Sequence, residues 1–140
     1  MPDVVFLDTN VLLDVLLNRQ PFAPEAQRIW SLAEKRQIRA CVSAATFLNV
    51  YYIVRRLASR QQADRAVRGL RAIFQILPID SDAIDQAIES PLKDFEDAVQ
   101  HACTLRARAL CIITRDERHF SRSSLPVISP DAFLARPESK

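Results

Sequence analysis

The sequence predicts a single α/β domain in which a parallel sheet carries helices on both faces. Short apolar runs of strand type alternate with longer stretches of helical periodicity, which is typical of that architecture. The chain of 140 residues is the right size for one domain with a sizeable core. No internal repeat, low-complexity segment or linker divides it. We expect the domain to cover residues 1–136 and the tail 137–140 to be frayed.

The first half of the chain contains two expected strands and four expected helices. Residues 4–7 are a continuous apolar run, which favours a strand buried on both faces. A helical pattern over 11–17 follows, with Thr9 or Asn10 as its N-cap. The second strand is expected at 38–42. The other three helices are expected at 21–35, opened by Pro21 and Pro24, at 44–59, capped by Ser43, and at 61–74.

The second half contains three more expected strands. Residues 76–79 form a strand that Pro78 interrupts, and we place it near an edge because proline cannot donate to a sheet. Residues 110–113 read as a buried strand, and 126–128 as a last short one. Helices are expected at 81–89, capped by Ser81, at 94–107, and in a final turn that begins at Ser129. The helix over 94–107 has its predicted apolar stripe at Phe95, Ala98, Val99, Ala102 and Leu105.

Glycine is almost absent from the chain. Gly69 is the only one, where average usage would give about ten. A loop that cradles phosphate with its backbone amides needs several glycines, so a dinucleotide fingerprint and a P-loop are both excluded. Gly69 itself falls inside the expected helix 61–74, where a single glycine is tolerated. Any phosphate chemistry must therefore depend on side chains.

The remaining composition sets milder limits. The formal net charge of +2 is too small to indicate nucleic-acid binding by itself. Cys41, Cys103 and Cys111 have no paired spacing and are expected to be buried thiols in a reducing compartment. The chain begins without a basic leader and contains no apolar run of membrane length. We therefore expect a cytoplasmic protein with no membrane contact.

Charge is segregated along the chain. Residues 80–97 contain seven acids and one lysine, whereas residues 55–71 contain six arginines and one acid. A cation-binding pocket beside a basic surface is typical of an enzyme that acts on nucleic acid. Two solvated helix faces, or a docking surface for an acidic protein, explain the same pattern. The charge pattern alone does not decide between them.

Polar residues gather where the expected strands end. The carboxyl ends of parallel strands lie at one edge of a sheet, which is where ligands bind in this architecture. Asp8 ends the first strand, and Asn49 lies in the second turn after the second strand. The other polar residues at this edge open the helix before the fourth strand or follow that strand: Asp94, Glu96, Asp97, Thr114, Arg115, Asp116 and Glu117.

Carboxylates that converge in this way repel one another unless a cation lies between them. Mg²⁺ prefers oxygen ligands, and it can activate water and stabilise charge on a phosphodiester. In the helix 94–107, Asp94, Asp97 and His101 fall within about 60° of one another, while Glu96 lies about 100° from Asp97. Asp97 is therefore the better partner for Asp8. Taken singly, each acid is explained as a helix cap, a dipole partner or a turn residue.

Three motifs together resemble the PIN-domain family. The run VFLDTNVLLD at 5–14 resembles the first family motif, and Asp97 followed by Ala98 resembles the internal aspartate motif. The run ITRD at 113–116, followed by Phe120, resembles the motif written T-R-D/N-x-x-D-F. The match extends over about residues 4–134. The runs at 18–22 and 93–98 are similar to a subgroup of VapC-type toxins from bacterial toxin–antitoxin pairs.

The resemblance implies a five-stranded parallel sheet with strand order 3-2-1-4-5. It also implies a Mg²⁺- or Mn²⁺-dependent endoribonuclease that forms a homodimer and is inhibited by an antitoxin. Carried over by motif, Asp8, Asp97 and Asp116 are the metal ligands and the catalytic residues. Thr9, Asn10 and Thr114 fall at supporting positions, and Asp94 belongs to the same group of supporting residues.

The sequence departs from the family pattern at two positions. Asn49 stands where many PIN domains have a glutamate, which removes one negative charge but still allows contact with a metal-held water. His119 stands at the second acid of the T-R-D motif, which weakens the case for two metal ions. Glu96 or Glu117 would compensate for the missing acids.

Two other functions remain open at this point. A degenerate PIN fold that only binds its partner is favoured by Asn49 and His119. A phosphoryl-transfer enzyme of the haloacid dehalogenase type also has an aspartate after its first strand. Those enzymes need a second aspartate two residues later, where this chain has Asn10, and no suitably placed lysine is evident.

Overall fold

The protein is described here by a computed structural model that covers residues 3–120 and 123–136. Five strands form one parallel sheet in the order β3-β2-β1-β4-β5. This order is the one that the resemblance to PIN domains implied, and it places β3 at an edge, as expected from Pro78. The expected frayed tail at 137–140 lies outside the described residues. The strands are β1 (Val4–Leu7), β2 (Arg39–Ser43), β3 (Gln75–Leu77), β4 (Cys111–Ile113) and β5 (Val127–Ile128).

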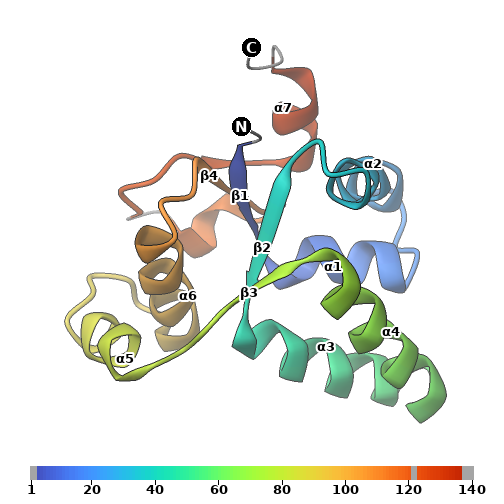
Figure 1. The fold of residues 1–140 in the computed structure, drawn as a ribbon, viewed down its shortest axis with the longest axis horizontal. Coiled ribbons are helices and arrows are strands. Elements are labelled where there is room, and N and C mark those ends of the chain that lie inside the picture. Colours follow the sequence, from blue (N-terminus) through green and yellow to red (C-terminus); the bar gives the residue numbers. More distant parts are fainter. Residues whose placement is uncertain (1–2, 121–122, 137–140) are drawn as a thin grey trace.

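Seven α-helices cover the two faces of the sheet in the described part of the chain (Figure 1). All seven occur where the sequence predicted them, with ends shifted by a few residues. A short 3₁₀ helix, η1 (Glu117–Phe120), was not predicted. One face is covered by α1 (Thr9–Leu16), α2 (Ala23–Glu34), α3 (Ala44–Leu57), α4 (Arg60–Ile73) and α7 (Pro130–Ala135), and the other by α5 (Ser81–Ile88) and α6 (Phe95–Arg106).

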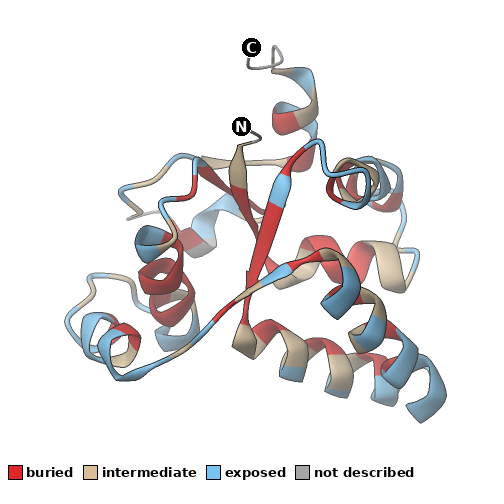
Figure 2. Cartoon of the chain, viewed as in Figure 1, coloured by how far each residue is buried: buried red, intermediate tan, exposed pale blue. Residues whose placement is uncertain are grey.

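The core consists of two apolar layers, one on each side of the sheet. Val5 and Leu7 of β1 pack in the layer under α1 to α4, and Phe6 packs in the layer under α5 and α6. Successive side chains of a strand point to opposite faces, so a strand buried on both faces must be apolar throughout. Figure 2 shows the buried central strands in red between the two helical layers. This arrangement explains the continuous apolar run at 4–7.

The structure corrects two predicted helix caps. The N-cap of α1 is Asp8, not Thr9 or Asn10, because an Asp8 side-chain oxygen accepts from the Thr9 amide at 2.8 Å. The N-cap of α5 is Asp80, not Ser81, and its carboxylate accepts from the Ala83 amide at 3.0 Å. In both cases an aspartate one or two positions earlier has the extended backbone of a cap, and its charge suits the positive end of a helix dipole.

The predicted apolar stripe of α6 is wrong at both ends. Phe95 is 53% exposed and Leu105 is 40% exposed, while Ala98, Val99 and Ala102 are buried as expected. The helix is instead buried on most of its circumference over 98–104, including the polar side chains of Gln100 and Thr104. It lies between the sheet and α5, so position in the fold outweighs the polarity of these side chains.

No helix in the described ranges is both long enough and apolar enough to cross a membrane. The longest, α3 and α4, have 14 residues each, whereas a membrane span needs about 20.

Candidate functional site

Asp8 is the centre of the polar cluster at the carboxyl edge of the sheet. It follows β1 directly and is 5% exposed. One carboxylate oxygen accepts from the Thr9 amide at 2.8 Å. The other accepts from the Thr114 hydroxyl at 2.8 Å and from the Asn10 side-chain amide at 3.3 Å. These three donors compensate for the loss of water and hold the carboxylate in one orientation.

Thr114 connects the ends of β1 and β4. The pairing of Leu7 with Ile113 brings residues 8 and 114 side by side, as predicted from the parallel sheet. Thr114 is fully buried, and its hydroxyl donates to Asp8. The same oxygen accepts from the Asn10 side-chain amide and from the Asp116 backbone amide, both at 3.1 Å. A single hydroxyl therefore links Asp8, Asn10 and the segment that carries Asp116.

Asp116 follows β4 in a loop before η1. Its carboxylate is half-buried and pairs with Arg118 at 3.2 Å, and this contact raises the pKa of Arg118. Arg118 is 91% exposed, so the pair has little energetic weight. Glu117 is exposed on η1 and lies outside the hydrogen-bonded cluster around Asp8. The role of Glu117 as a compensating acid stays a prediction.

The N-terminus of α6 contributes the second group of acids. Asp94 is the N-cap and accepts from the Asp97 amide at 2.9 Å. Glu96 accepts from Asn49 of α3 at 2.5 Å and from Gln100 at 3.3 Å. The contact between Asn49 and Glu96 joins the helical layers of the two faces. Asn49, whose identity departs from the family pattern, thus orients a neighbouring carboxylate.

Thr9 supports the cluster from the side of α3. Its hydroxyl lies 3.1 Å from the hydroxyl of Thr46, which is itself buried and 3.5 Å from the hydroxyl of Ser43. The Thr9 amide, rather than its hydroxyl, contacts Asp8. The row of hydroxyls fixes the start of α3 against the start of α1.

Two buried amide oxygens in this region have no hydrogen-bond partner among the described residues. They are Oδ1 of Asn10 and Oε1 of Gln100. Each amide has its nitrogen committed, Asn10 to Asp8 and Thr114, and Gln100 to Glu96. A buried oxygen without a donor is costly unless water or a cation contacts it. Gln100 was not singled out from the sequence. Its position four residues after Glu96, on the same side of the helix, could have indicated a contact between these two side chains.

The donors at this edge are oxygens of carboxylates, amides and hydroxyls. Oxygen atoms of these types are the ligands that a hard divalent cation prefers. The buried Asn10 oxygen without a hydrogen-bond partner, close to Asp8, is consistent with a cation bound there. Over residues 3–120 and 123–136, however, no three His, Cys, Asp or Glu side chains are grouped closely enough to hold a metal ion. The metal-ligand set of Asp8, Asp97 and Asp116 therefore stays a prediction.

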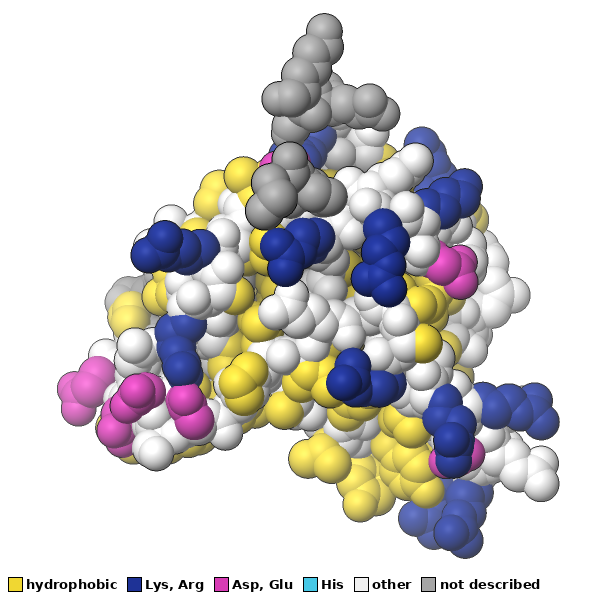
Figure 3. Space-filling model, viewed as in Figure 1, with side chains coloured by type: hydrophobic (Ala, Val, Ile, Leu, Met, Phe, Trp, Pro, Cys, Tyr) yellow, Lys and Arg dark blue, Asp and Glu magenta, His cyan; other side chains and the backbone are white. Residues whose placement is uncertain are grey.

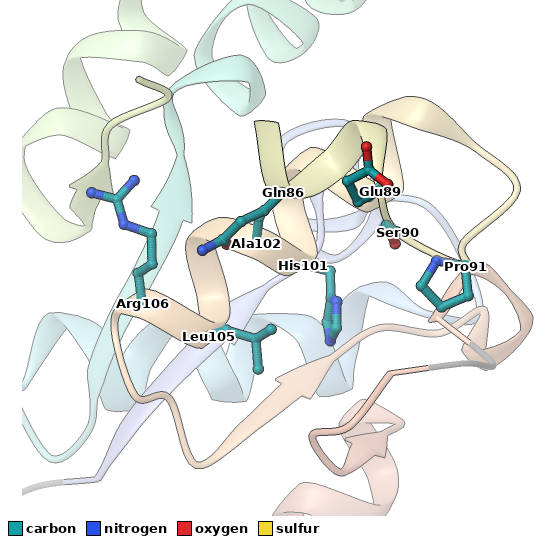
Figure 4. A pocket seen from close by; sticks show the side chains of 9 residues that line it. Gln86, Glu89, Ser90, Pro91, His101, Ala102, Leu105 and Arg106 are labelled. Carbon is teal, nitrogen blue, oxygen red and sulfur yellow. The ribbon is translucent and has the colours of Figure 1, made fainter. Parts of the chain in front are cut away.

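A pocket of about 380 Å³ lies elsewhere, between α5 and α6 (Figure 4). Its lining is largely apolar and includes His101, Ala102 and Leu105, with Glu89 and Arg106 among the charged lining residues. Burial lowers the pKa of His101 and so favours its neutral imidazole. The sequence grouped His101 with Asp94 and Asp97 on one side of the helix, and in the structure His101 lines this pocket.

Comparison with known proteins identifies a family. A family model described as PIN domain matches residues 4–118. No curated protein matches the chain. Among solved structures, a toxin–antitoxin complex from Klebsiella pneumoniae is 22% identical, covers 90% of this chain and 97% of its own, and superposes with a TM-score of 0.68.

Two further solved structures resemble the chain at lower identity. VapC20 of Mycobacterium tuberculosis, described as a toxin that cleaves the sarcin–ricin loop, is 16% identical, with coverage of 86% and 95% and a TM-score of 0.71. A DNA-bound VapBC from Salmonella typhimurium is 18% identical, with coverage of 93% and 99% and a TM-score of 0.69. At these identities the likeness concerns the fold.

Proposed function

The chain belongs to the PIN-domain family, and from that premise we propose that it is a metal-dependent endoribonuclease, the toxin of a toxin–antitoxin pair that acts in the cytoplasm. The single observation that carries the proposal is the cluster in which Thr114 ties the buried carboxylate of Asp8 to the segment of Asp116. Toxins from such pairs are also among its structural neighbours.

Each residue of the cluster has a part in the proposed reaction. Asp8, Asp97 and Asp116 would hold Mg²⁺ or Mn²⁺, and a bound cation supplies an acidified water and stabilises charge on the phosphodiester. Thr114 and Asn10 hold the Asp8 carboxylate in a fixed orientation. Such fixed neighbours matter because a carboxylate that must reorient before reaction loses rate.

Glu96 compensates for the charge that Asn49 lacks. In many family members a glutamate occupies the position of Asn49, and here Asn49 donates to Glu96 from across the edge. The pair therefore presents one carboxylate and one amide, with the carboxylate supplied by α6 rather than α3. Gln100 also donates to Glu96, which gives that carboxylate two fixed contacts.

An RNA substrate is consistent with the surface charge. Figure 3 shows acids over α5 at one end of this face and arginines around the outer end of α3 and α4 at the other. Arg60, Arg65, Arg68 and Arg71 of α4 are exposed, and only Arg68 has an acid partner, Asp64, among the described contacts. Arginines of this kind neutralise phosphates of a nucleic-acid backbone.

An antitoxin and a second copy of the chain are the proposed protein partners. Leu48 and Tyr52 of α3 are 63% and 61% exposed, and Phe95 of α6 is 53% exposed. Leu48 and Phe95 directly precede Asn49 and Glu96 in the chain, and the side chains of Asn49 and Glu96 are hydrogen-bonded. Exposed apolar groups of this size are typical of interaction surfaces.

Cleavage of RNA by the purified protein tests the proposal. We expect cleavage with Mg²⁺ or Mn²⁺ and none after chelation. The variant Asp97→Asn should abolish cleavage while its circular dichroism spectrum stays that of the wild type. The control variant Asp85→Asn removes an exposed acid of α5 and should cleave normally. Equal cleavage by Asp97→Asn would point to a contaminating nuclease and reject the proposed activity.

A binding module without catalysis is the second candidate, favoured by the amide at Asn49 and by the absence of a grouped metal-ligand set among the described residues. Calorimetry distinguishes the two functions. Tight binding of Mn²⁺ would count against the binding module, as would growth arrest on expression that Asp8→Ala relieves. RNA binding without cleavage at any metal concentration would favour the binding module.

A further inference from the structure

Asp14 is a buried acid on α1 that the proposed reaction does not use. It is 1% exposed, and both of its carboxylate oxygens accept from Arg115. The Arg115 Nε donates at 2.8 Å and its Nη2 donates at 3.2 Å. Arg19 also approaches the carboxylate, at 3.9 Å. Because an unpaired buried charge is costly, this two-pronged contact fixes Arg115 against α1.

The segment 18–22, which the sequence singled out, covers this ion pair. The guanidinium of Arg115 lies 4.2 Å from the centroid of the Phe22 ring, and Phe22 is 41% exposed. The Arg19 amide donates to the backbone oxygen of Asp14 at 3.0 Å, which ties the segment to α1. Only arginine can grip a carboxylate with two parallel bonds while its flat face stacks on a ring.

Arg115 lies between Thr114 and Asp116 in the chain. Thr114 is bonded to Asp8, the N-cap of α1, and Arg115 is bonded to Asp14 in the second turn of α1. One helix therefore holds two consecutive residues at the end of β4. The next residue, Asp116, is beyond the strand, and its backbone continues from these two anchored residues.

We propose that Arg115 is a positioning residue: paired with Asp14 and covered by Phe22, it holds Asp116 at the edge where Asp8 lies. Its effect on catalysis rests on the proposed function, whereas its effect on the geometry of Asp116 does not. Arg115 acts through Asp116 and makes no contact with RNA in this scheme.

The positioning role is tested by three single variants, one double variant of Arg115 and Asp14, and a control. Arg115→Gln and Asp14→Asn each break the ion pair. Phe22→Leu removes only a partly exposed aromatic ring, so this variant should fold even if replacing the buried Asp14 prevents folding. The matched control is Arg106→Gln, which breaks another two-pronged pair, with Asp80, on the other face of the sheet. The readouts are Mn²⁺ affinity by calorimetry, kcat and KM for RNA cleavage, and hydrogen exchange of the Asp116 amide.

We expect Arg115→Gln to weaken Mn²⁺ binding by about 10–100-fold, as is usual when a residue that orients a metal ligand is removed. The value of kcat should fall with it, while KM for RNA stays near that of the wild type. Asp14→Asn should match it, and the double variant should lose no more than either single one. Phe22→Leu should show a smaller loss in the same direction, and Arg106→Gln none.

Separate outcomes overturn the positioning role and the proposed function. Wild-type Mn²⁺ affinity and kcat in Arg115→Gln and Phe22→Leu would reject the positioning role and leave the nuclease intact. A change in KM alone would reject it in favour of direct RNA contact. If the wild type neither binds Mn²⁺ nor cleaves RNA, the nuclease is rejected. In that case hydrogen exchange of the Asp116 amide tests the positioning role of Arg115 separately. Faster exchange in Arg115→Gln than in Arg106→Gln supports this role, and equal exchange rates overturn it.

Discussion

Replacing Thr114 with valine removes one hydroxyl and keeps the shape of the side chain. The hydroxyl is fully buried and makes three hydrogen bonds: it donates to Asp8 and accepts from Asn10 and from the Asp116 amide. In Thr114→Val the buried carboxylate of Asp8 therefore loses one hydrogen-bond donor, and the Asn10 side-chain amide and the Asp116 backbone amide lose an acceptor. It is the substitution that most directly tests whether one oxygen holds the cluster together.

The expected cost follows from those three contacts. A hydrogen bond to a charged group is worth about 1.5–3 kcal/mol, and a neutral one about 1 kcal/mol. Asn10 keeps its bond to Asp8, and the amide of half-buried Asp116 can bond to water, which reduces the sum. We expect Thr114→Val to lower the free energy of unfolding by about 2–4 kcal/mol. The measurement is urea denaturation at pH 7 followed by circular dichroism.

Thr114→Ser is the matched control because it keeps the hydroxyl and loses only a methyl group. That loss costs about 1 kcal/mol for a buried position, so the serine variant should be the more stable of the two. If Thr114→Val is instead as stable as the wild type, or more stable than Thr114→Ser, the methyl group matters and the hydroxyl does not. The description of Thr114 as the link between Asp8 and Asp116 is then wrong.

Three further predictions concern positions outside the cluster. A Cβ added at Gly69 meets no atom within 4 Å, so Gly69→Ala should raise the free energy of unfolding in urea by about 0.5–1 kcal/mol through helix propensity; a decrease would contradict the open space there. Burial raises the pKa of Cys41 to about 12 and of Cys111 to about 11, and it also raises the pKa of Cys103. All three thiols should therefore react with a disulfide reagent at pH 8 only as fast as the protein unfolds, and rapid labelling of the native protein would refute their burial. Burial lowers the pKa of His101 below its ordinary value of 6.5. Protonation of His101 therefore opposes folding: the stability of the protein is unaffected above pH 6.5 and falls as the pH drops from 6.5 through the lower pKa of the folded state. Between pH 7.5 and 5.5 the wild type should lose more stability in urea than His101→Gln does, and parallel losses would show that His101 titrates normally in the folded protein.

The succession of strands and helices along the chain was predictable because each type of element has a distinct periodicity. The run at 4–7 is apolar throughout because both faces of β1 are covered, and sequence alone carries that signal. The caps of α1 and α5 were misassigned, since several adjacent residues of capping type compete and only the backbone conformation selects Asp8 and Asp80. The partly wrong stripe of α6 has a different cause: contacts from both the sheet and α5 bury polar side chains there.

For the candidate site, sequence reasoning worked where the sheet itself brings residues together. The parallel pairing of β1 with β4 placed Asp8 beside Thr114, as expected. Contacts between side chains of separate helices were beyond it. The bond from Asn49 to Glu96 and the pair of Asp14 with Arg115 depend on how α3, α6 and the loop after β4 settle against their neighbours. Neither contact has a fixed spacing in sequence that reveals it.

The bond between Thr114 and Asp8 spans 106 residues of chain, and that separation has a consequence for synthesis. A ribosome makes Asp8 early and Thr114 late, and at typical elongation rates of about 5–20 residues per second the interval is roughly 5–20 s. During that interval the nascent chain already contains β1 but has no partner for it on the β4 side. The link from Asp8 to Asp116 is therefore a property of the finished chain, and a truncated or incompletely translated product that ends before residue 114 lacks the hydroxyl that makes it.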